Sequence, residues 1–370
     1  MPATTYVPPL GCTLDEIDTP ALCVDLDVME ANIRKMSALC AQHRVNWRPH
    51  AKGHKSPAIA RLQQKAGAIG VTCAKLGEAE VMAAGGIDGI LVANQIVGQP
   101  KLARLVALRH EADPIVAVDD LVQVEQLDDA ARRADVTLSL IIEVDIGLRR
   151  AGVEPGEATV NLARHVANRP ALVLTGIMGY EGHLLTVEDQ AEKERRIREA
   201  MACLVETKHQ VERAGIPCPI VSAAGTGSCL FTMRCSGITE LQAGGLIFMD
   251  AYYRRRCMVA EFDFALKLLT TVVSRPARDR AIIDAGRKSQ NAEVEKPFVH
   301  GREDIHVARL SAEHGWLELD PSAQDLRIGD RLELIPGYGD FTTVLHDELY
   351  GVRSGRLEVI WPILARGKIR

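Results

Sequence analysis

The chain has 370 residues, of which 47% are hydrophobic and 25% charged, and 44 basic against 49 acidic residues give a formal net charge of −5. This length is sufficient for a large barrel and a second domain, and the nearly balanced charge predicts neither a nucleic-acid partner nor an acidic membrane partner. No apolar run reaches the roughly 18 residues that span a bilayer, so we expect no membrane-spanning segment.

The start of the chain and its cysteines predict a cytoplasmic location. Residues 1–6 lack a basic region followed by an apolar one, which predicts that there is no signal peptide. Nine cysteines are scattered singly, without a Cys-x-x-Cys pair. This pattern favours reduced thiols in a cytoplasmic protein over a disulfide framework.

After a strand predicted at residues 19–26, eight short apolar runs alternate with amphipathic segments. They lie at residues 45–47, 70–75, 90–94, 114–118, 138–144, 172–178, 220–224 and 238–242. Buried parallel strands have this character because helices cover both of their faces. The order predicts an α/β fold with a TIM (β/α)8 barrel, and a doubly wound open sheet is the main alternative.

The pattern changes near residue 265, where strand-like runs with turns between them replace the helical periodicity. These runs lie at 266–273, 280–284, 305–310, 331–335 and 357–361. They predict an all-β C-terminal domain of about 100 residues. We therefore expect a barrel domain over 19–264 and a β-domain over 265–370, the latter together with residues 1–18.

A basic loop follows the strand predicted at 45–47, and it reads Arg48-Pro49-His50-Ala51-Lys52-Gly53-His54-Lys55. Ser56-Pro57 after it predicts the start of a helix, with proline at the first helical position. A lysine at the carboxyl end of a strand lies where barrels hold catalytic groups, and its amine can form a Schiff base. A solvated basic loop is the alternative interpretation.

Polar residues also follow two later strands. The loop that begins at Asp145 contains Arg149 and Arg150, which suit an anionic or aromatic cofactor. The loop that begins at Gly179 offers the ring of Tyr180 for stacking and the imidazole of His183 for acid–base chemistry. Each loop taken alone also fits an ordinary charged turn.

Glycine-containing loops follow the last two barrel strands. They are Ser222-Ala223-Ala224-Gly225-Thr226-Gly227-Ser228 and Gly244-Gly245. Small residues let backbone N–H groups approach an anion closely, and loops after the seventh and eighth strands are the usual phosphate site of a TIM barrel. Neither fits the Gly-x-Gly-x-x-Gly pattern of dinucleotide-binding folds. A phosphate site, an early lysine and a large barrel together indicate pyridoxal 5′-phosphate.

The motifs, in their order along the chain, resemble those of the D-threonine aldolase / D-serine dehydratase family, which are fold-type III pyridoxal-phosphate enzymes related to alanine racemase. They are Pro-His-Ala-Lys52, Asp145-x-Gly-x-x-Arg150-x-Gly152, Tyr180-Glu-Gly-His183, Gly225-Thr226-Gly227-Ser228, Glu240-Leu-Gln-Ala-Gly244, Asp284-Ala-Gly286 and Glu313-His314-Gly315. The resemblance runs from about residue 19 to 367. Within the family, Phe248-Met249-Asp250-Ala251 is most similar to the 3-hydroxy-D-aspartate aldolases.

The resemblance implies a homodimer in which each chain has a TIM barrel, a C-terminal β-domain and pyridoxal 5′-phosphate attached to Lys52. It implies that Arg150 and Tyr180 contact the cofactor ring. It also implies that His183 removes the proton of the substrate's β-hydroxyl. The cofactor's phosphate site corresponds to Ser222, Gly225, Thr226, Gly244 and Gly245.

The family's divalent-metal site has the pattern Pro-x-His-x-(Cys/Asp), and the matching run here is Pro336-Gly337-Tyr338-Gly339-Asp340. Tyr338 replaces the expected histidine, and a neutral tyrosine is a poor ligand for a divalent ion. Asp340, with water completing the shell, suits a loosely held Mg²⁺ better than Zn²⁺. We therefore expect weak Mg²⁺ activation at most; a loop shift in which His346 substitutes is the alternative.

The implied activity is cleavage of the Cα–Cβ bond of D-3-hydroxy-amino acids, of the D-threonine or 3-hydroxy-D-aspartate type, to glycine and an aldehyde. Deaminating dehydration and racemisation use the same cofactor and stay open as alternatives, because a fold does not decide between them. A non-catalytic pyridoxal-phosphate carrier is a further alternative, against which the C-terminal β-domain argues.

Overall fold

The computed structural model describes residues 6–370, so the signal-peptide expectation for residues 1–5 lies outside the described residues. The chain forms two compact units. The β-unit comprises the chain up to Asn32 with Leu246–Ile363, and the barrel unit comprises Ile33–Gly245 with Leu364–Arg370. The domain boundaries predicted at 19–264 and 265–370 stay a proposal, since β1 (Ala21–Asp25) falls in the first range but pairs with strands of the β-unit.

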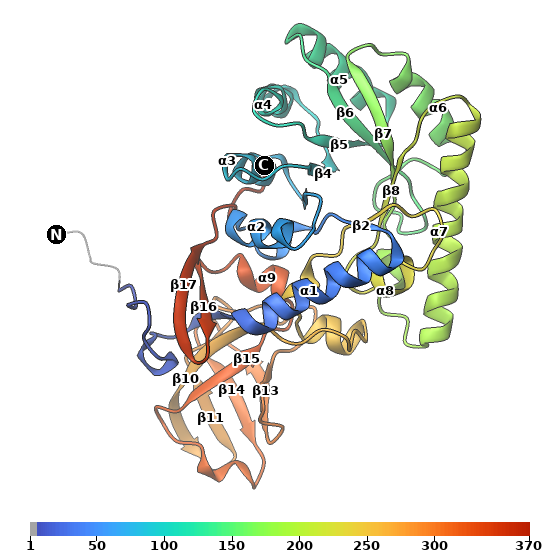
Figure 1. Cartoon of the computed structure of the whole chain (residues 1–370). Helices are drawn as coiled ribbons and strands as arrows, with labels where there is room; N and C mark the ends of the chain where they lie inside the picture. Colours follow the sequence, from blue (N-terminus) through green and yellow to red (C-terminus); the bar gives the residue numbers. More distant parts are fainter. Residues whose placement is uncertain (1–5) are drawn as a thin grey trace, which may run out of the picture. The chain divides into compact units, whose positions relative to one another are not determined.

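The barrel unit contains, within the described chain, a sheet of eight parallel strands in the order β2-β9-β8-β7-β6-β5-β4-β3 (Figure 1). They are β2 (Asn46–Trp47), β3 (Val71–Cys73), β4 (Ile90–Gln95), β5 (Ile115–Val118), β6 (Leu138–Glu143), β7 (Leu172–Met178), β8 (Ile220–Ala223) and β9 (Glu240–Leu241). Each of the eight predicted barrel strands is present, so this prediction is confirmed.

The two ends of this sheet meet through the chain that follows β2. The backbone N of Ile69 donates to the carbonyl oxygen of Trp47 at 2.8 Å. The backbone N of Thr72, in β3, donates to the carbonyl oxygen of Pro49 at 2.9 Å. His50 also forms a parallel β-bridge with Thr72. These bonds close the sheet into a barrel, which confirms the TIM-barrel prediction over the open sheet.

Helices alternate with the barrel strands along the chain. They are α1 (Leu26–His43), α2 (Pro57–Lys65), α3 (Leu76–Ala84), α4 (Gln99–Arg109), α5 (Leu121–Arg133), α6 (Glu157–Ala167), α7 (Gln190–Arg213) and the short α8 (Cys229–Thr232). Ser56 is the N-cap of α2 and Pro57 its first residue, as the sequence predicted. Inside the barrel, Leu91 and Ile141 are wholly buried in one cluster, and burying such a side chain contributes about 1.5–3 kcal/mol.

The β-unit contains a nine-stranded sheet in the described chain, in the order β13-β14-β11-β10-β1-β16-β17, with β15 paired to β10 and β12. Its further strands are β10 (Leu266–Ala277), β11 (Arg280–Ile283), β12 (Phe298–Val299), β13 (Ile305–Leu310), β14 (Gly315–Leu319), β15 (Arg331–Ile335), β16 (Glu348–Arg353) and β17 (Arg356–Pro362). The pairs are antiparallel except β1 with β16. The five predicted C-terminal strands are confirmed, whereas β12, β14 and β16 were not predicted.

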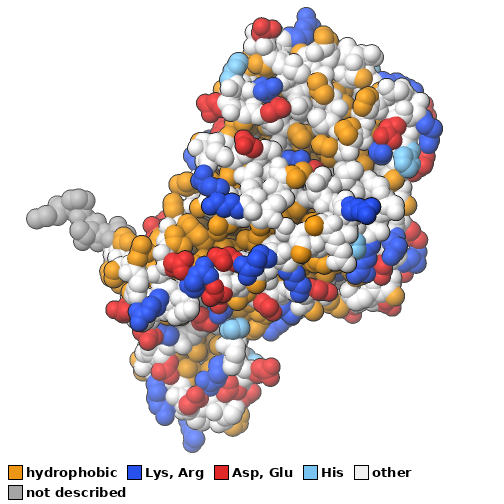
Figure 2. Space-filling view, in the orientation of Figure 1, with side chains coloured by type: hydrophobic (Ala, Val, Ile, Leu, Met, Phe, Trp, Pro, Cys, Tyr) orange, Lys and Arg blue, Asp and Glu red, His pale blue; other side chains and the backbone are white. Residues whose placement is uncertain are grey.

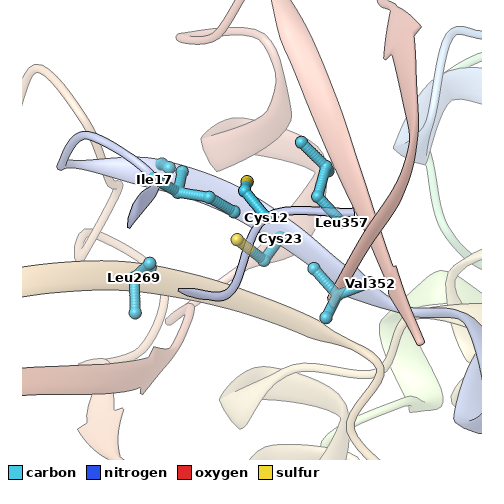
Figure 3. Packing of buried hydrophobic residues seen from close by; sticks show 7 residues of the cluster. Cys12, Ile17, Cys23, Leu269, Val352 and Leu357 are labelled. Carbon is cyan, nitrogen blue, oxygen red and sulfur yellow. The ribbon is translucent and has the colours of Figure 1, made fainter. Parts of the chain in front are cut away.

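The core of the β-unit explains why β1 joins this sheet. Ala21 and Cys23 of β1 pack with Leu269 of β10 and Val352 of β16. Cys12, Ile17 and Leu357 complete this cluster of buried residues (Figure 3). The apolar side chains of β1 therefore face partners that lie more than 200 positions away in the sequence.

The surface has no large area of one charge on the face in Figure 2, where acidic and basic side chains are interspersed. Within residues 6–370, no helix is both long enough and apolar enough to cross a membrane.

Candidate active site

Lys52 lies just after β2, in a 3-10 helix that comprises Ala51–Gly53. Its backbone N donates to Nδ1 of His50 at 3.4 Å. Desolvation and the nearby positive charges of Lys52 and Lys55 lower the pKa of His50 well below its usual range. The imidazole beside Lys52 is therefore neutral at neutral pH and remains a hydrogen-bond acceptor.

The other lysine of this loop, Lys55, is held in a buried ion pair. Its Nζ lies 2.9 Å from Oε1 of Glu78, and its backbone has a left-handed φ of 51°. Breaking a buried pair by removing one partner costs roughly 3–5 kcal/mol. This geometry gives Lys55 a structural role and distinguishes it from Lys52.

The strand that leads to Lys52 is fixed to β9 by a second buried ion pair. Arg48 donates from Nε and Nη2 to the two carboxylate oxygens of Glu240, at 3.1 and 2.9 Å. A bidentate hydrogen bond of this kind restrains both the position and the orientation of the Arg48 side chain. It connects the segment that carries Lys52 to the strand that leads to Gly244.

Arg150 and Tyr180 follow the neighbouring strands β6 and β7, and the guanidinium carbon lies 5.6 Å from the centre of the Tyr180 ring. Glu143 accepts from Arg150 at 3.4 Å and from Gln95 at 2.7 Å. Gln95 also donates to Asp119 at 3.1 Å. This network, from the ends of β4, β5 and β6, orients Arg150. The sequence analysis did not identify Gln95, Asp119 or Glu143, because each is a single polar residue outside any motif.

The glycine-containing loop after β8 lies against Tyr180. Ala224, at its start, has a left-handed φ of 70°. A Cβ placed on Gly225 would lie 3.0 Å from the Tyr180 ring, and one on Gly244 would overlap the carbonyl oxygen of His50. Glycine is therefore required at position 244, where the loop meets the segment before Lys52, and at position 225 a side chain would press on the Tyr180 ring.

The donors of these loops fit a phosphate group. In the described part of the chain, the backbone N–H groups of Gly227 and Gly244 have no acceptor. Thr226 is buried beside them, and Ser222 accepts from Gln242 at 2.9 Å. Gly245 begins a 3-10 helix that ends at Ile247. Unpaired N–H groups among small residues form a concave anion site.

Glu181, which the sequence analysis noted only as part of a motif, is fully buried and is hydrogen-bonded to the same loop. One carboxylate oxygen accepts from the backbone N of Ala224 at 3.3 Å, and the other accepts from Oγ1 of Thr232 at 2.7 Å. Burial raises the pKa of Glu181, against hydrogen bonds that lower it. Glu181 thus fixes both the start of the loop and the helix α8 that follows it.

His183 lies in a 3-10 helix that comprises Gly182–Leu184, after β7. A Cβ on Gly147 would lie 2.9 Å from its Nε2, so the imidazole packs against the loop that carries Arg150. Desolvation and the charge of Arg196 lower the pKa of His183. A neutral imidazole can accept a proton at neutral pH.

The barrel order brings these residues to one side of the barrel mouth. Strands β6, β7, β8, β9 and β2 are consecutive neighbours in the sheet. The loops that follow them carry Arg150, Tyr180, Thr226, Gly244 and Lys52, respectively. Catalytic groups of TIM barrels occupy this end of the strands, so these residues form the candidate active site.

The segment predicted as a metal site lies in the β-unit, at the short helix α9 (Gly339–Thr343). The hydroxyl of Tyr338 donates to Oδ2 of Asp340 at 2.8 Å, and burial raises the pKa of Tyr338. The phenol is therefore neutral and uses the carboxylate as its acceptor. Its ring packs against Tyr252, Tyr253 and Phe341.

The metal prediction for this segment stays a prediction, since Tyr338 and Asp340 are hydrogen-bonded to each other. Among residues 6–370, no three His, Cys, Asp or Glu side chains lie close enough together to hold an ion. His346, the alternative ligand, has its Nε2 2.7 Å from the carbonyl oxygen of Ser289.

Comparison with known proteins gives two family matches. The "Alanine racemase, N-terminal domain" model matches residues 24–252, and the "Putative serine dehydratase domain" model matches residues 265–352. The chain is 37% identical to a 3-hydroxy-D-aspartate aldolase of Paracoccus denitrificans (strain Pd 1222), over 97% of this chain and 94% of that protein. It is also 37% identical to a D-threonine aldolase of Arthrobacter sp., over 96% and 95%.

The comparison with solved structures also gives an aldolase and a dehydratase. The crystal structure of D-threonine aldolase from Filomicrobium marinum has a TM-score of 0.95 and 37% identity, and the match covers 98% of this chain and 100% of that one. D-threo-3-hydroxyaspartate dehydratase from Delftia sp. HT23 has a TM-score of 0.87 and 26% identity, with 95% and 98% covered. The chain therefore belongs to the D-threonine aldolase / D-serine dehydratase family of alanine-racemase-like enzymes, as its motifs predicted.

Proposed function

We propose that the protein is a pyridoxal-phosphate-dependent lyase that cleaves the Cα–Cβ bond of D-3-hydroxy-amino acids, giving glycine and an aldehyde. The observation that carries this proposal is the 37% identity to two aldolases over nearly the whole chain. The D-threo-3-hydroxyaspartate dehydratase of Delftia is less similar, at 29% identity over 88% of the chain. Aldol cleavage is thus favoured over dehydration and racemisation.

The residues at the barrel mouth would hold the cofactor as follows. Nζ of Lys52 is the point of covalent attachment, and Arg150 and Tyr180 flank the ring. Ser222, Gly225, Thr226, Gly244 and Gly245 form the phosphate site. When bound, pyridoxal 5′-phosphate supplies an electron sink for the electron pair left at Cα.

The chain's own side chains would move the protons. His183, whose pKa is lowered, takes the proton of the β-hydroxyl, as a general base that is neutral at the working pH. Lys52 returns a proton to Cα after the bond has broken. Arg150, oriented by Glu143, supplies a fixed positive charge next to the ring.

We infer that the metal requirement differs from the family pattern. The Tyr338–Asp340 hydrogen bond occupies the one matching ligand, so we propose weak Mg²⁺ activation at most, through Asp340. Chelator treatment with elemental analysis tests this. Stoichiometric zinc or manganese, with activity that depends on it, would contradict the proposal.

We further propose a homodimer in the cytoplasm that acts on a small D-amino acid. Closed two-fold assemblies are the commonest oligomers. None of the nine cysteines, all within residues 6–370, forms a disulfide, which supports a reducing compartment. Light scattering that gives only a 40.4 kDa species would exclude the dimer.

Two measurements test the activity. Borohydride reduction of the purified protein with pyridoxal 5′-phosphate, followed by peptide mapping, should label Lys52, and a label on Lys55 would contradict the assignment. Product analysis with D-threonine, D-3-hydroxyaspartate, D-phenylserine and D-serine should give glycine and an aldehyde. A 2-oxo acid with ammonia would instead identify a dehydratase.

A further inference from the structure

A cavity of about 340 Å³ lies in the β-unit, between the loop 287–297 and the strand β13. β13 is an edge of the sheet (Figure 1), so this side of the strand is not covered by another strand of that sheet order. Ligand pockets for small molecules begin at roughly this size, about 300 Å³. The residues discussed above for the cofactor lie in the barrel unit, and none of them lines this cavity.

Gln290 lines the cavity and has an unsatisfied side chain. It is wholly buried, and neither Nε2 nor Oε1 has a hydrogen-bond partner among the described residues. Buried amides without partners are rare in native structures, because each lost bond to water must be replaced. The cavity therefore lies beside a buried amide whose hydrogen bonds are not satisfied.

The cavity has more positive than negative side chains. Arg287, Lys296 and Arg309 line it, against the single acidic residue Glu293. Nε of Arg287 donates to the carbonyl oxygen of Leu310 at 3.1 Å. The remaining guanidinium nitrogens of Arg287 have no partner among the described residues.

Arg309 is an exposed residue whose guanidinium contacts an aromatic ring. Its guanidinium stacks on the Trp316 ring, with its carbon 3.8 Å from the ring centre. Stacking on the face leaves the N–H groups in the guanidinium plane available for a planar oxyanion. The arginine is therefore preorganised for a carboxylate.

We propose that this cavity binds a small dianion, of the dicarboxylate class. Three positive and one negative side chain give a lining charge of +2, which a dianion neutralises. The carboxylates accept from the guanidinium groups of Arg287 and Arg309.

If the basic side chains of the cavity have a purely structural role, a different result is expected. Lys296 donates a hydrogen bond to the carbonyl oxygen of Ala308 at 3.3 Å, and Arg287 donates one to the carbonyl oxygen of Leu310. Basic side chains placed in this way protect an edge strand from pairing with other chains. In that case the cavity holds only water, and anions bind without saturation.

Calorimetric titration with malonate distinguishes dianion binding from a purely structural role. The titration uses the full-length protein, saturated with pyridoxal 5′-phosphate, at low ionic strength. We expect saturable binding that is weakened about tenfold by Arg309→Met and by Arg287→Met, which corresponds to about 1.4 kcal/mol each. Gln290→Glu, of nearly equal size, adds a negative charge beside the cavity and should abolish the binding. Arg278→Met removes an exposed arginine outside the cavity and should leave the affinity unchanged.

The titration is repeated with inorganic phosphate. Saturable phosphate binding without malonate binding, lost in the same variants, would support an anion site but assign it to phosphate esters. The absence of saturable binding for both anions would overturn the proposal, and so would an affinity that the arginine variants do not change. Repeating the titration without cofactor keeps this result independent of whether the barrel binds pyridoxal 5′-phosphate.

Discussion

Replacing Glu181 tests whether this buried carboxylate positions the proposed phosphate loop. It accepts from Ala224, where the loop begins, and from Thr232, in the helix after the loop. Glu181→Ala removes both acceptors. Glu181→Gln keeps one oxygen for the Ala224 N–H, and the hydroxyl of Thr232 can rotate to accept from the new amide.

The size of the effect follows from these two bonds. Each buried donor left without an acceptor costs about 1–3 kcal/mol, so Glu181→Ala should destabilise the protein by about 2–6 kcal/mol. That is a large part of a typical folding free energy of about 5–15 kcal/mol. Glu181→Gln should cost less, at most about 1.5 kcal/mol, because one bond is kept and the other is reversed.

The effect on cofactor affinity should depend on the cofactor's phosphate group. We expect the dissociation constant for pyridoxal 5′-phosphate to rise about tenfold to a hundredfold in Glu181→Ala, which corresponds to about 1.4–2.8 kcal/mol. The affinity for pyridoxal should stay the same, because pyridoxal has no phosphate group for the loop 224–228 to bind. Fluorescence titration of the cofactor-free protein measures both constants.

A matched control removes a carboxylate elsewhere in the barrel unit. Glu157 is exposed in the first turn of α6, and Glu157→Gln should change neither stability nor affinity. Equal losses of affinity for pyridoxal and its phosphate in Glu181→Ala would refute the reasoning, because they would show general damage to the fold. Unchanged affinity for both would refute it as well.

Four further predictions follow from the same geometry. Burial raises the pKa of Glu181, so its folded pKa exceeds its unfolded value, and the stability of wild type relative to Glu181→Gln should fall as the pH rises above about 4.3; denaturation at a series of pH values that shows a rise would contradict this. Arg48→Met should cost roughly 3–5 kcal/mol in urea denaturation, because it leaves the carboxylate of Glu240 buried and unpaired; a change below 1 kcal/mol would show that Glu240 finds another partner. Tyr338→His should create the family's metal-ligand pair with Asp340 and give a protein that holds a divalent ion on elemental analysis, whereas an unchanged metal content would exclude this position as the site. His183→Ala should lower the cleavage rate about 10²–10⁴-fold without changing the dissociation constant of pyridoxal 5′-phosphate; an unchanged rate would remove His183 as the base.

The barrel could be predicted because its signal is local. A parallel strand buried on both faces appears in the sequence as a short apolar run, as in β6, where almost every residue is buried. The ends of these runs also located the motifs of Lys52, Arg150 and Tyr180, since a loop that follows a barrel strand lies at the barrel mouth. Strands β14 and β16 of the β-unit were missed; each contains a glycine, a residue that is depleted in strands.

Other features depend on partners that are distant in the sequence. The segment of β1 predicts a strand, but its sheet is decided by its pairing with β10 and β16. The network of Gln95, Asp119 and Glu143 consists of single polar residues that meet only when β4, β5 and β6 become neighbours.

The sequence by itself determined that the chain has a barrel, that a lysine-bearing loop follows an early strand, and which family it resembles. Only the tertiary structure showed that Lys55 is held in a buried ion pair, because its partner Glu78 lies in α3, 23 positions away. Only the tertiary structure assigned Glu181 to the loop that begins at Ala224, 43 positions away. Burial and hydrogen bonding between distant segments produce both results, and a sequence pattern contains no direct record of either.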